Sequence, residues 1–422
     1  MFRTIDVDLI IFGGGIAGLW TLNRVVQSGY NAILLEKNQL GGGQTICSQG
    51  IIHGGIKYAL NGMLTSASNA IREMPAVWEA CLDGSGPIDL TEVEVLSRAH
   101  YLWSKQSISA RMAAFFASRA VQGRISHVPS QERPDTFRNN RFRGSVYRLH
   151  EFVMEVHSLV QVLAKPVTDR IFHASPEDYV LDHQDGTVTA LKFPEHAFSL
   201  RPKKMLFCCG EGYEELAKRF SLPAPEMQLR SLHMVMVKFD QQRTATNTPA
   251  SNRAQGGSFL GKTTSMYARY PASPLYAHCL SGGTRPLVTI TTHYTQDRSM
   301  VWYLGGEIAE SGTKRNVEEQ VDAAKSTLEE LLPWVDFDNT QWATLQINRA
   351  EPKQSTLTLP DSAFAESYEN FITAWPTKLA LAPDLAEKVL SYLPPAEGGN
   401  LPEQLSVLPT PSIATTAWEE AF

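Results

Sequence analysis

The hydrophobic pattern at the start of the chain predicts a strand, a helix and a second strand. Val7–Phe12 is a short apolar run that ends at Gly13, as a buried strand would. Residues 16–27 carry apolar side chains at helical spacing, and Gly29 stands where it can end the helix. Ala32–Leu35 is a second apolar run of strand length. Three such elements within about 30 residues have the size of one βαβ unit.

Beyond this unit the pattern is mixed, and in the second half it becomes strand-like. It predicts helices at Ala110–Ala120, His150–Leu163, Val317–Leu332 and Pro383–Leu393. It predicts strands at Arg170–His173, Lys204–Cys209, Leu232–Phe239, Leu287–Thr292, Met300–Leu304 and Phe371–Lys378, and a hairpin of Val180–Asp182 with Val188–Phe193. Residues 129–143 indicate an exposed loop and Gln241–Gly261 a polar linker. The pattern favours an α/β unit made of separated segments and interrupted by a β-rich insertion.

Three glycines follow the first strand directly and open the helix. Gly13, Gly15 and Gly18 satisfy the pattern G-x-G-x-x-G, and Glu36 stands at the end of the second strand. The first glycine allows a tight turn, the second lets the backbone approach a pyrophosphate, and the third lets the helix pack on the strand. The helix N-terminus offers free N–H groups to phosphate, and Glu36 can accept hydrogen bonds from ribose hydroxyls. The unit therefore predicts a dinucleotide site, and the carboxylate disfavours the 2′-phosphate of NADP.

The stretch that follows Glu36 distinguishes a flavin dinucleotide from a nicotinamide one. It contains Gly41-Gly42-Gly43-Gln44-Thr45 and then Ser48-Gln49-Gly50-Ile51-Ile52-His53-Gly54-Gly55, which offer small residues, hydroxyls and one histidine. Small residues allow the close backbone approach that a flavin ring needs. This stretch resembles the FAD-binding segment of the D-amino-acid oxidase superfamily, in particular its glycerol-3-phosphate dehydrogenase and L-2-hydroxyglutarate oxidase branches. Those branches carry a Ser-rich stretch that runs into an Ile-His-x-Gly pattern.

Three later segments support this resemblance. His150–Val153, the helix after it and Arg170-Ile171 look like the family's second adenosine-side crossover. Lys204–Gly212 looks like the strand and Gly-rich turn beneath the cofactor. Thr377-Lys378-Leu379 resembles the Gly-Lys-Leu-Thr-Thr turn that contacts the flavin in glycerol-3-phosphate dehydrogenases.

The resemblance implies an α/β fold, with a Rossmann-like FAD-binding domain into which a β-rich (α+β) substrate domain is inserted. We expect the FAD-binding domain to comprise residues 1–75, 148–225 and 340–422, and the substrate domain residues 76–147 and 226–339. The implied cofactor is FAD, with contacts from Gly13, Gly15, Ile16, Ala17, Gly18, Glu36, Lys37, Gln44, Thr45, Ser48, Gln49, Gly50, Ile52, Gly210, Thr377, Lys378 and Leu379.

Two candidates for the chemistry lie near the C-terminus, where the chain departs from the family. Pro376 stands where the family has glycine, and Asn348-Arg349-Ala350-Glu351 replaces its usual Gly-Arg-Pro. In the resembling enzymes an arginine near Arg349 binds the substrate anion, and the alternative for Arg349 is an ion pair with Glu351. Lys378 would stabilise negative charge at the N1–C2=O edge of a reduced flavin, unless it points to solvent. Fold and cofactor therefore carry over from the family, whereas the substrate does not.

Histidines supply the remaining candidates. His53 lies in the flavin-side segment, where it could accept a proton, attach the flavin covalently or only hold a loop by hydrogen bonds. His278 and His293 each lie near an expected strand, and they could be a base and its partner or two structural side chains.

Composition narrows the class of protein further. The 422 residues are 43% hydrophobic and 19% charged, as in an ordinary globular protein. The net charge of −6 argues against nucleic acid as a partner, because phosphate binding needs clustered Lys and Arg. Five cysteines without zinc-type spacing indicate reduced thiols and no metal site. We see no N-terminal signal and no membrane-spanning apolar stretch, and therefore expect a cytoplasmic protein, with peripheral membrane association left open.

These observations favour FAD-dependent dehydrogenation of a small anionic hydroxy compound, either a hydroxy acid or a polyol phosphate. A hydride would pass to the flavin while a base removes the O–H proton. An amine or amino acid is the alternative substrate, and the electron acceptor is left open between oxygen, a quinone and a carrier protein. Two other classes stay open: a flavin-binding protein that oxidises no substrate, and an NAD-linked enzyme without flavin. The colour of the purified protein separates the second from a flavoprotein.

Overall fold

The computed structural model describes residues 2–55, 67–105, 125–184, 187–222, 225–239, 269–280, 285–353, 362–398 and 403–422. The helix expected at Ala110–Ala120 and the linker expected at Gln241–Gly261 lie outside these ranges.

The chain divides into two compact units, each made from separated segments. The first comprises Met1–Arg98, His150–Ser231 and Ile347–Ala417. The second comprises Ala99–Leu149, Leu232–Gln346 and Trp418–Phe422. Compared with the boundaries expected from the sequence, residues 76–98 and 226–231 belong to the first unit. Residues 148–149, 340–346 and 418–422 belong to the second.

A largely parallel sheet organises the first unit, in the order β10-β11-β12-β1-β2-β9, with β19 beside β12 and β18 beside β19. These strands are β1 (Arg3–Phe12), β2 (Ala32–Glu36), β9 (Ile171–His173), β10 (Val180–Gln184), β11 (Thr187–Phe193), β12 (Phe198–Phe207), β18 (Phe364–Tyr368) and β19 (Phe371–Trp375). β1 pairs in parallel with β2 and β12, and β9 pairs in parallel with β2. The βαβ unit expected from the first hydrophobic runs is therefore present, with its second crossover returning to β9.

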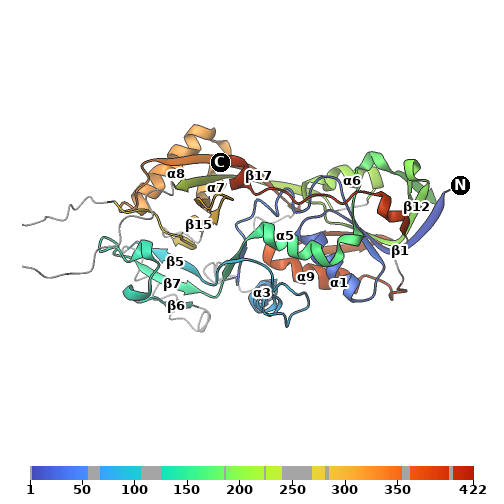
Figure 1. The fold of residues 1–422 in the computed structure, drawn as a ribbon, viewed down its shortest axis with the longest axis horizontal. Helices are drawn as coiled ribbons and strands as arrows, with labels where there is room; N and C mark the ends of the chain where they lie inside the picture. Colours follow the sequence, from blue (N-terminus) through green and yellow to red (C-terminus); the bar gives the residue numbers. More distant parts are fainter. Residues whose placement is uncertain are drawn as a thin grey trace, which may run out of the picture. The chain divides into compact units, whose positions relative to one another are not determined.

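Successive side chains of β1 point to opposite faces of this sheet, and both faces are covered. Leu9 and Ile11 enter a core shared with α1 (Ile16–Gln27), α3 (Ala67–Leu82), α5 (Val156–Ala164) and α9 (Ala382–Ser391). Ile10 and Phe12 enter the opposite core, which includes Phe220 of α6 (Tyr213–Phe220). Figure 1 shows α1, α5 and α9 gathered along the first of these faces. Coverage on both faces explains why the strand sequences read as continuous apolar runs.

A small sheet in the same unit corrects one sequence prediction. Its strands are β3 (Ile51–Ile52), β8 (Phe152–Met154) and β4 (Val95–Ser97), with β8 antiparallel to both neighbours. The helix expected at His150–Leu163 therefore begins only at α5, after a strand. Glu155 separates the two elements, because its carboxylate accepts the first free N–H groups of α5.

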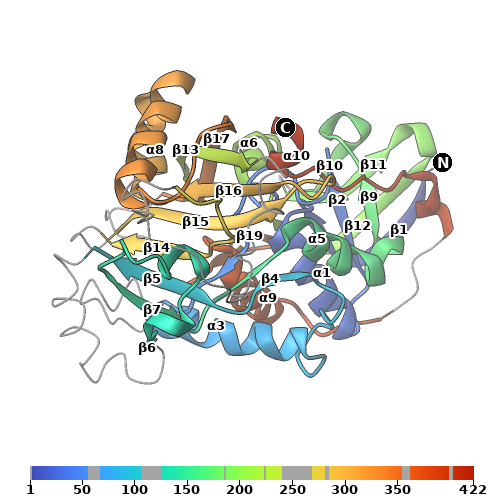
Figure 2. The ribbon, with the colours of Figure 1, turned by 60° about the vertical axis from the view of Figure 1, so that its left-hand side comes forward.

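The second unit is built on an antiparallel-rich sheet in the order β17-β13-β16-β15-β14-β5-β7-β6. These strands are β5 (His100–Ser104), β6 (Ile125–His127), β7 (Ser145–Leu149), β13 (Met227–Phe239), β14 (Ala277–Leu280), β15 (Pro286–Tyr294), β16 (Met300–Gly305) and β17 (Thr340–Pro352). Figure 2 shows α8 (Val317–Leu331) lying along this sheet, and its buried residues Ala324 and Leu328 share a core with Val235 and Trp302. Among its described residues the second unit is thus β-rich and contains the long helix α8, as the sequence predicted.

Candidate cofactor and active site

The glycine-rich turn sits between β1 and α1, and two of its glycines cannot be replaced without moving backbone. Gly13 has a φ of +111°, and a Cβ there would lie 2.7 Å from the Cys209 Cα atom. A Cβ on Gly18 would lie 1.9 Å from the Gly13 carbonyl oxygen. Because real Cβ contacts are essentially never this short, the backbone after β12 requires glycine at position 13, and the close approach of α1 to the turn requires glycine at position 18.

Glu36 holds this turn from the end of β2. Its Oε2 atom accepts the Gly14 N–H at 2.6 Å, and its Oε1 atom accepts the Asn38 N–H at 2.8 Å. A carboxylate can accept about four hydrogen bonds, so each oxygen keeps a lone pair for a further donor such as a ribose hydroxyl. Glu36 therefore holds both the glycine turn and the start of the loop after β2, and its free lone pairs fit a ligand that donates hydrogen bonds.

The N-terminus of α1 carries the features that a pyrophosphate requires. Gly15 is the N-cap residue and has no capping side chain, and the N-terminus of α1 carries the partial positive charge of the helix dipole. The Thr45 hydroxyl accepts the Ile16 N–H at 3.1 Å. The Ser48 Oγ atom is buried and has no hydrogen-bond partner among the described residues. Ser48 N–H donates to the carbonyl of Thr45, so this unpartnered buried hydroxyl belongs to the segment that meets the α1 N-terminus. It fits a phosphate-bearing cofactor, since buried polar groups are normally paired.

Gln44 links this cofactor segment to the end of β17. Its Oε1 atom accepts the Ala350 N–H at 3.1 Å. Two residues earlier, Asn348 Nδ2 donates to Glu211 Oε1 at 2.9 Å, in the turn that follows β12. Arg349 therefore lies between two residues that are tied to cofactor-side loops of the first unit.

Glu351 was the alternative partner for Arg349, and the structure gives its carboxylate other partners. Glu351 Oε1 lies 3.3 Å from Arg230 Nε and accepts the Gln228 Nε2–H at 3.2 Å. The Glu351 side chain is buried, so this pairing neutralises a charge that burial would otherwise penalise.

His53 is held by a carboxylate that sequence reasoning assigned no role. His53 Nδ1 lies 3.2 Å from Glu151 Oε2, and Glu151 Oε1 accepts the Gly54 N–H at 3.1 Å. Because a carboxylate can only accept, the contact places a proton on Nδ1 and leaves Nε2 as the acceptor nitrogen. β3 and β8 bring the two residues together although they are 98 positions apart. An acidic residue directly before the apolar run Phe152–Met154 was the available signal.

The turn after β19 contains Thr377 and Lys378. Thr377 has a φ of +62°, a left-handed conformation that is costly for a β-branched residue, and its hydroxyl donates to the Ser362 carbonyl at 3.4 Å. Lys378 is the extended residue before the short 3₁₀ turn Leu379–Leu381. Position 377 thus has a backbone conformation that glycine would favour, although Thr377 occupies it. The residue before it is Pro376.

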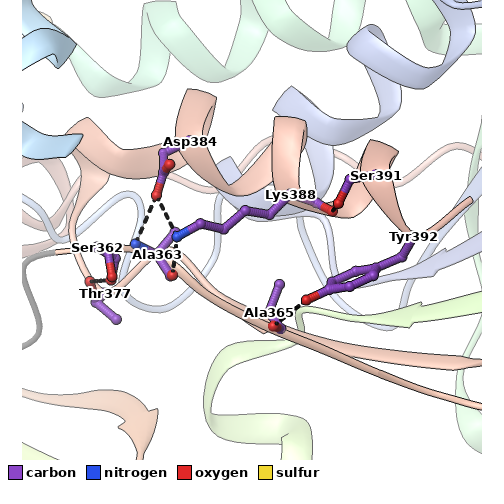
Figure 3. Close-up of polar contacts among 8 residues, drawn as sticks. All are labelled: Ser362, Ala363, Ala365, Thr377, Asp384, Lys388, Ser391 and Tyr392. Carbon is purple, nitrogen blue, oxygen red and sulfur yellow. Dashed lines mark hydrogen bonds and ion pairs between the residues drawn. The ribbon is translucent and has the colours of Figure 1, made fainter. Parts of the chain in front are cut away.

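α9 fixes the other side of this turn. Asp384 Oδ2 accepts the Ala363 N–H at 3.0 Å, and Lys388 Nζ donates to the Ala363 carbonyl at 2.7 Å (Figure 3). The two charged side chains also pair with each other at 2.9 Å, one helical turn apart. The backbone N–H and carbonyl of Ala363, just before β18, are therefore both held by side chains of α9.

Comparison with known proteins identifies the family. The family model for FAD-dependent oxidoreductases (DAO) matches residues 8–343. The chain is 41% identical to the probable FAD-dependent oxidoreductase PA4991 of Pseudomonas aeruginosa over the whole of both proteins. The chain belongs to the DAO family of FAD-dependent oxidoreductases. The resemblance, the fold class, the enzymatic class and the cofactor predicted from the sequence are thereby confirmed.

Solved structures with a similar fold include one at 37% and others at 12–13% sequence identity with this chain. The crystal structure of PA4991 matches with a TM-score of 0.79 at 37% identity, covering 100% of this chain and 99% of that one. Glycine oxidase from Geobacillus kaustophilus matches with a TM-score of 0.58 at 13% identity, covering 92% and 94%. L-α-glycerophosphate oxidase from Mycoplasma pneumoniae matches with a TM-score of 0.55 at 12% identity, covering 94% and 99%. The last two matches concern the fold alone, which this chain shares with a glycine oxidase and with an L-α-glycerophosphate oxidase.

Two further groups of side chains in this DAO-family chain are the adjacent cysteines that follow β12 and the two histidines of the second unit. Burial raises the pKa of the thiols of Cys208 and Cys209, that of Cys209 to about 12, so both stay protonated. In the second unit, His278 Nδ1 lies 2.8 Å from Thr289 Oγ1, whereas the His293 ring stacks on Trp418 with centroids 4.0 Å apart. The structure thus gives the two histidines different partners. No helix within the described ranges has both the length and the apolar character that a membrane crossing requires.

Proposed function

We propose that this FAD-dependent oxidoreductase removes a hydride from a small anionic hydroxy compound, a hydroxy acid or a polyol phosphate, with His53 as the base. The observation that carries the proposal is the contact of 3.2 Å between His53 Nδ1 and the buried Glu151 carboxylate.

A hydroxy substrate needs such a base, whereas an amine does not. An alcohol O–H group stays protonated near neutral pH, so its proton must leave as the hydride departs. An amine with a pKa near 8–10 can shed its extra proton before it binds and then donates a hydride directly. With Nδ1–H held by Glu151, His53 can take the proton at Nε2, and the carboxylate then stabilises the imidazolium that forms. Glu151 therefore acts as a positioning residue for His53.

Arg349 is the residue we propose to hold the substrate anion. Its neighbours Asn348 and Ala350 are tied to Glu211 and Gln44, and the Glu351 carboxylate is engaged by Arg230. A guanidinium in this setting can offer two parallel N–H donors to a carboxylate or phosphate.

When bound, the cofactor supplies the redox chemistry by accepting a hydride, which carries two electrons. The chain's own residues would hold it through the α1 N-terminus, Thr45, Ser48 and Glu36, in a noncovalent complex. The Thr377–Lys378 turn would then provide backbone N–H groups and an ammonium to the flavin edge that becomes negative.

The test is a substrate screen under anaerobic conditions, with bleaching of the flavin as the readout. Hydroxy acids and polyol phosphates should bleach the flavin, and His53→Gln should slow this reaction while FAD stays bound. Arg349→Lys keeps the charge but loses the bidentate fork, so we expect a raised KM for the same substrate. Bleaching by amino acids alone, at a rate that His53→Gln does not change, would overturn the proposal in favour of an amino-acid oxidase.

A further inference from the structure

The end of the chain lies across the carboxyl ends of β2 and β9 in the first unit. Residues 409–414 read Pro-Thr-Pro-Ser-Ile-Ala, and prolines at alternate positions favour an extended backbone. The Pro409 carbonyl accepts the N–H of His173, the last residue of β9, at 2.6 Å. Just before it, Leu405 and Leu408 are buried in the core on one face of the sheet. We call residues 409–414 the C-terminal strap.

The strap pairs with the loop that follows Glu36. Leu40 N–H donates to the Ser412 carbonyl at 2.8 Å, and Ala414 N–H donates to the Leu40 carbonyl at 2.9 Å. These bonds make a parallel β-bridge between Leu40 and Ile413. Gln39 Nε2 adds a side-chain bond to Ser412 Oγ at 3.1 Å. Both backbone groups of the buried Leu40 are therefore satisfied by the strap.

The far end of the strap is anchored on α5. Ala414 packs with Ile46 and Val156 in a small buried cluster. Its carbonyl accepts a hydrogen bond from His157 Nδ1 at 3.1 Å. The strap is thus fixed at both ends, by β9 at Pro409 and by α5 at Ala414.

The loop that the strap holds, residues 38–41, is hydrogen-bonded to Glu36 and to the glycine turn. Asn38 N–H donates to Glu36 Oε1 at 2.8 Å, and Gly41 N–H donates to the Gly14 carbonyl at 2.8 Å. The Leu40 side chain lies against Gly14 so closely that a Cβ there would be 2.6 Å from Leu40 Cδ2. A displacement of Leu40 would therefore also move the glycine turn at Gly14 and the carboxylate of Glu36.

We propose that the C-terminal strap is part of the FAD-binding site. It braces residues 38–41 and so keeps the walls around the adenosine and pyrophosphate in binding geometry before the cofactor arrives. A preorganised site binds more tightly because less conformational freedom is lost on binding. Ligands in open α/β sheets lie outside the carboxyl ends of the strands, which is the edge that the strap crosses.

Two variants loosen the strap at different atoms. Ala414→Pro removes the N–H that donates to Leu40, and His157→Ala removes the donor to the Ala414 carbonyl. Loss of one such bond should release FAD from the holoenzyme about tenfold faster, followed by the rise of flavin fluorescence after dilution. The apoprotein should bind ADP about tenfold more weakly, because ADP occupies the braced subsite, whereas FMN binding should not change. Both measurements are made without substrate, so they do not depend on the proposed reaction.

Thr415→Pro is the matched control, since the exposed Thr415 has no hydrogen-bond partner in the part of the chain that the structure describes. It should retain FAD and ADP like the wild type. Wild-type release of FAD from both strap variants would refute the proposal, and so would equal weakening of ADP and FMN binding, which would indicate general loss of structure. If Ala414→Pro fails to fold, His157→Ala decides the question alone.

Discussion

Glu151→Gln keeps the size of a buried side chain and removes its charge, and it should separate a positioned base from a merely structural histidine. The Glu151 residue is 2% exposed, and its two oxygens serve the Gly54 N–H at 3.1 Å and His53 Nδ1 at 3.2 Å. A glutamine at this position has one acceptor oxygen and one NH₂ group, so it cannot accept from both partners.

Each orientation of the new amide has a cost for the proposed base. If the oxygen stays on Gly54, the NH₂ group faces His53 Nδ1 and forces the proton onto Nε2, which then cannot accept one. If the amide flips, the buried Gly54 N–H loses its partner at a cost of about 1–3 kcal/mol, and the productive tautomer becomes about 5- to 150-fold rarer. The imidazolium also loses an opposite charge, worth about 4 kcal/mol at 4 Å and an effective dielectric constant of 20, before screening. We therefore expect flavin reduction to slow by about 10²- to 10⁴-fold, the range for loss of a general base.

The assay is anaerobic stopped-flow reduction of the flavin by the hydroxy substrate that the screen identifies, with FAD content measured in each variant. Glu155→Gln is the control, because Glu155 is a nearby carboxylate that caps α5 and does not hold His53. It should reduce stability slightly and leave the reduction rate unchanged. Wild-type reduction by the Glu151→Gln holoenzyme would refute the role of the His53–Glu151 pair.

Three further predictions concern the cofactor, the second unit and the flavin-side turn. Glu36→Arg removes the acceptor of the Gly14 and Asn38 N–H groups and should weaken FAD binding by about 1–3 kcal/mol, measured by titration of the apoprotein. Burial lowers the pKa of His293 from 6.5 to about 3, so the unfolded chain binds a proton that the native state does not. The free energy of unfolding should therefore fall as pH drops from about 6.5 to about 3, and His293→Gln should flatten this dependence in urea titrations. Lys378→Met should lower the flavin potential and slow reduction while FAD stays bound; a wild-type potential would leave only the backbone of the turn as functional.

The cofactor half of the site was predictable because short-range geometry imposes it. Gly18 is required by its contact with Gly13 inside a single strand-turn-helix element. Gly13 is required by the positive φ of the turn, and a Cβ there would also meet Cys209 after β12. Glu36 follows from the length of the next strand. Such constraints leave a pattern at fixed spacing, which one sequence displays. The same reasoning located α1 and α8 with their ends correct to one residue.

Other parts depended on contacts that no local pattern records. The strand β8 was read as the start of a helix because Phe152–Met154 is too short to show a period, and its partners are at residues 51–52 and 95–97. The pairing of Glu151 with His53 requires that same sheet. The domain boundaries predicted from the sequence include the strap in the FAD-binding domain but give it no role, because its bonds to Leu40 and His173 leave no local pattern.

The difference between local patterns and contacts across the fold explains why the sequence predicted the cofactor but not the substrate. Binding of a dinucleotide rests on backbone N–H groups and on glycines that allow close approach, and these requirements do not depend on the substrate. Glycine oxidase and L-α-glycerophosphate oxidase share this fold with the chain at only 12–13% identity. The substrate half that we propose would rest instead on side chains such as His53, whose partner Glu151 comes from a separate segment. The proposal of a hydroxy substrate therefore depends on a polar pair built across the fold, His53 with Glu151, and the Glu151→Gln experiment tests that pair.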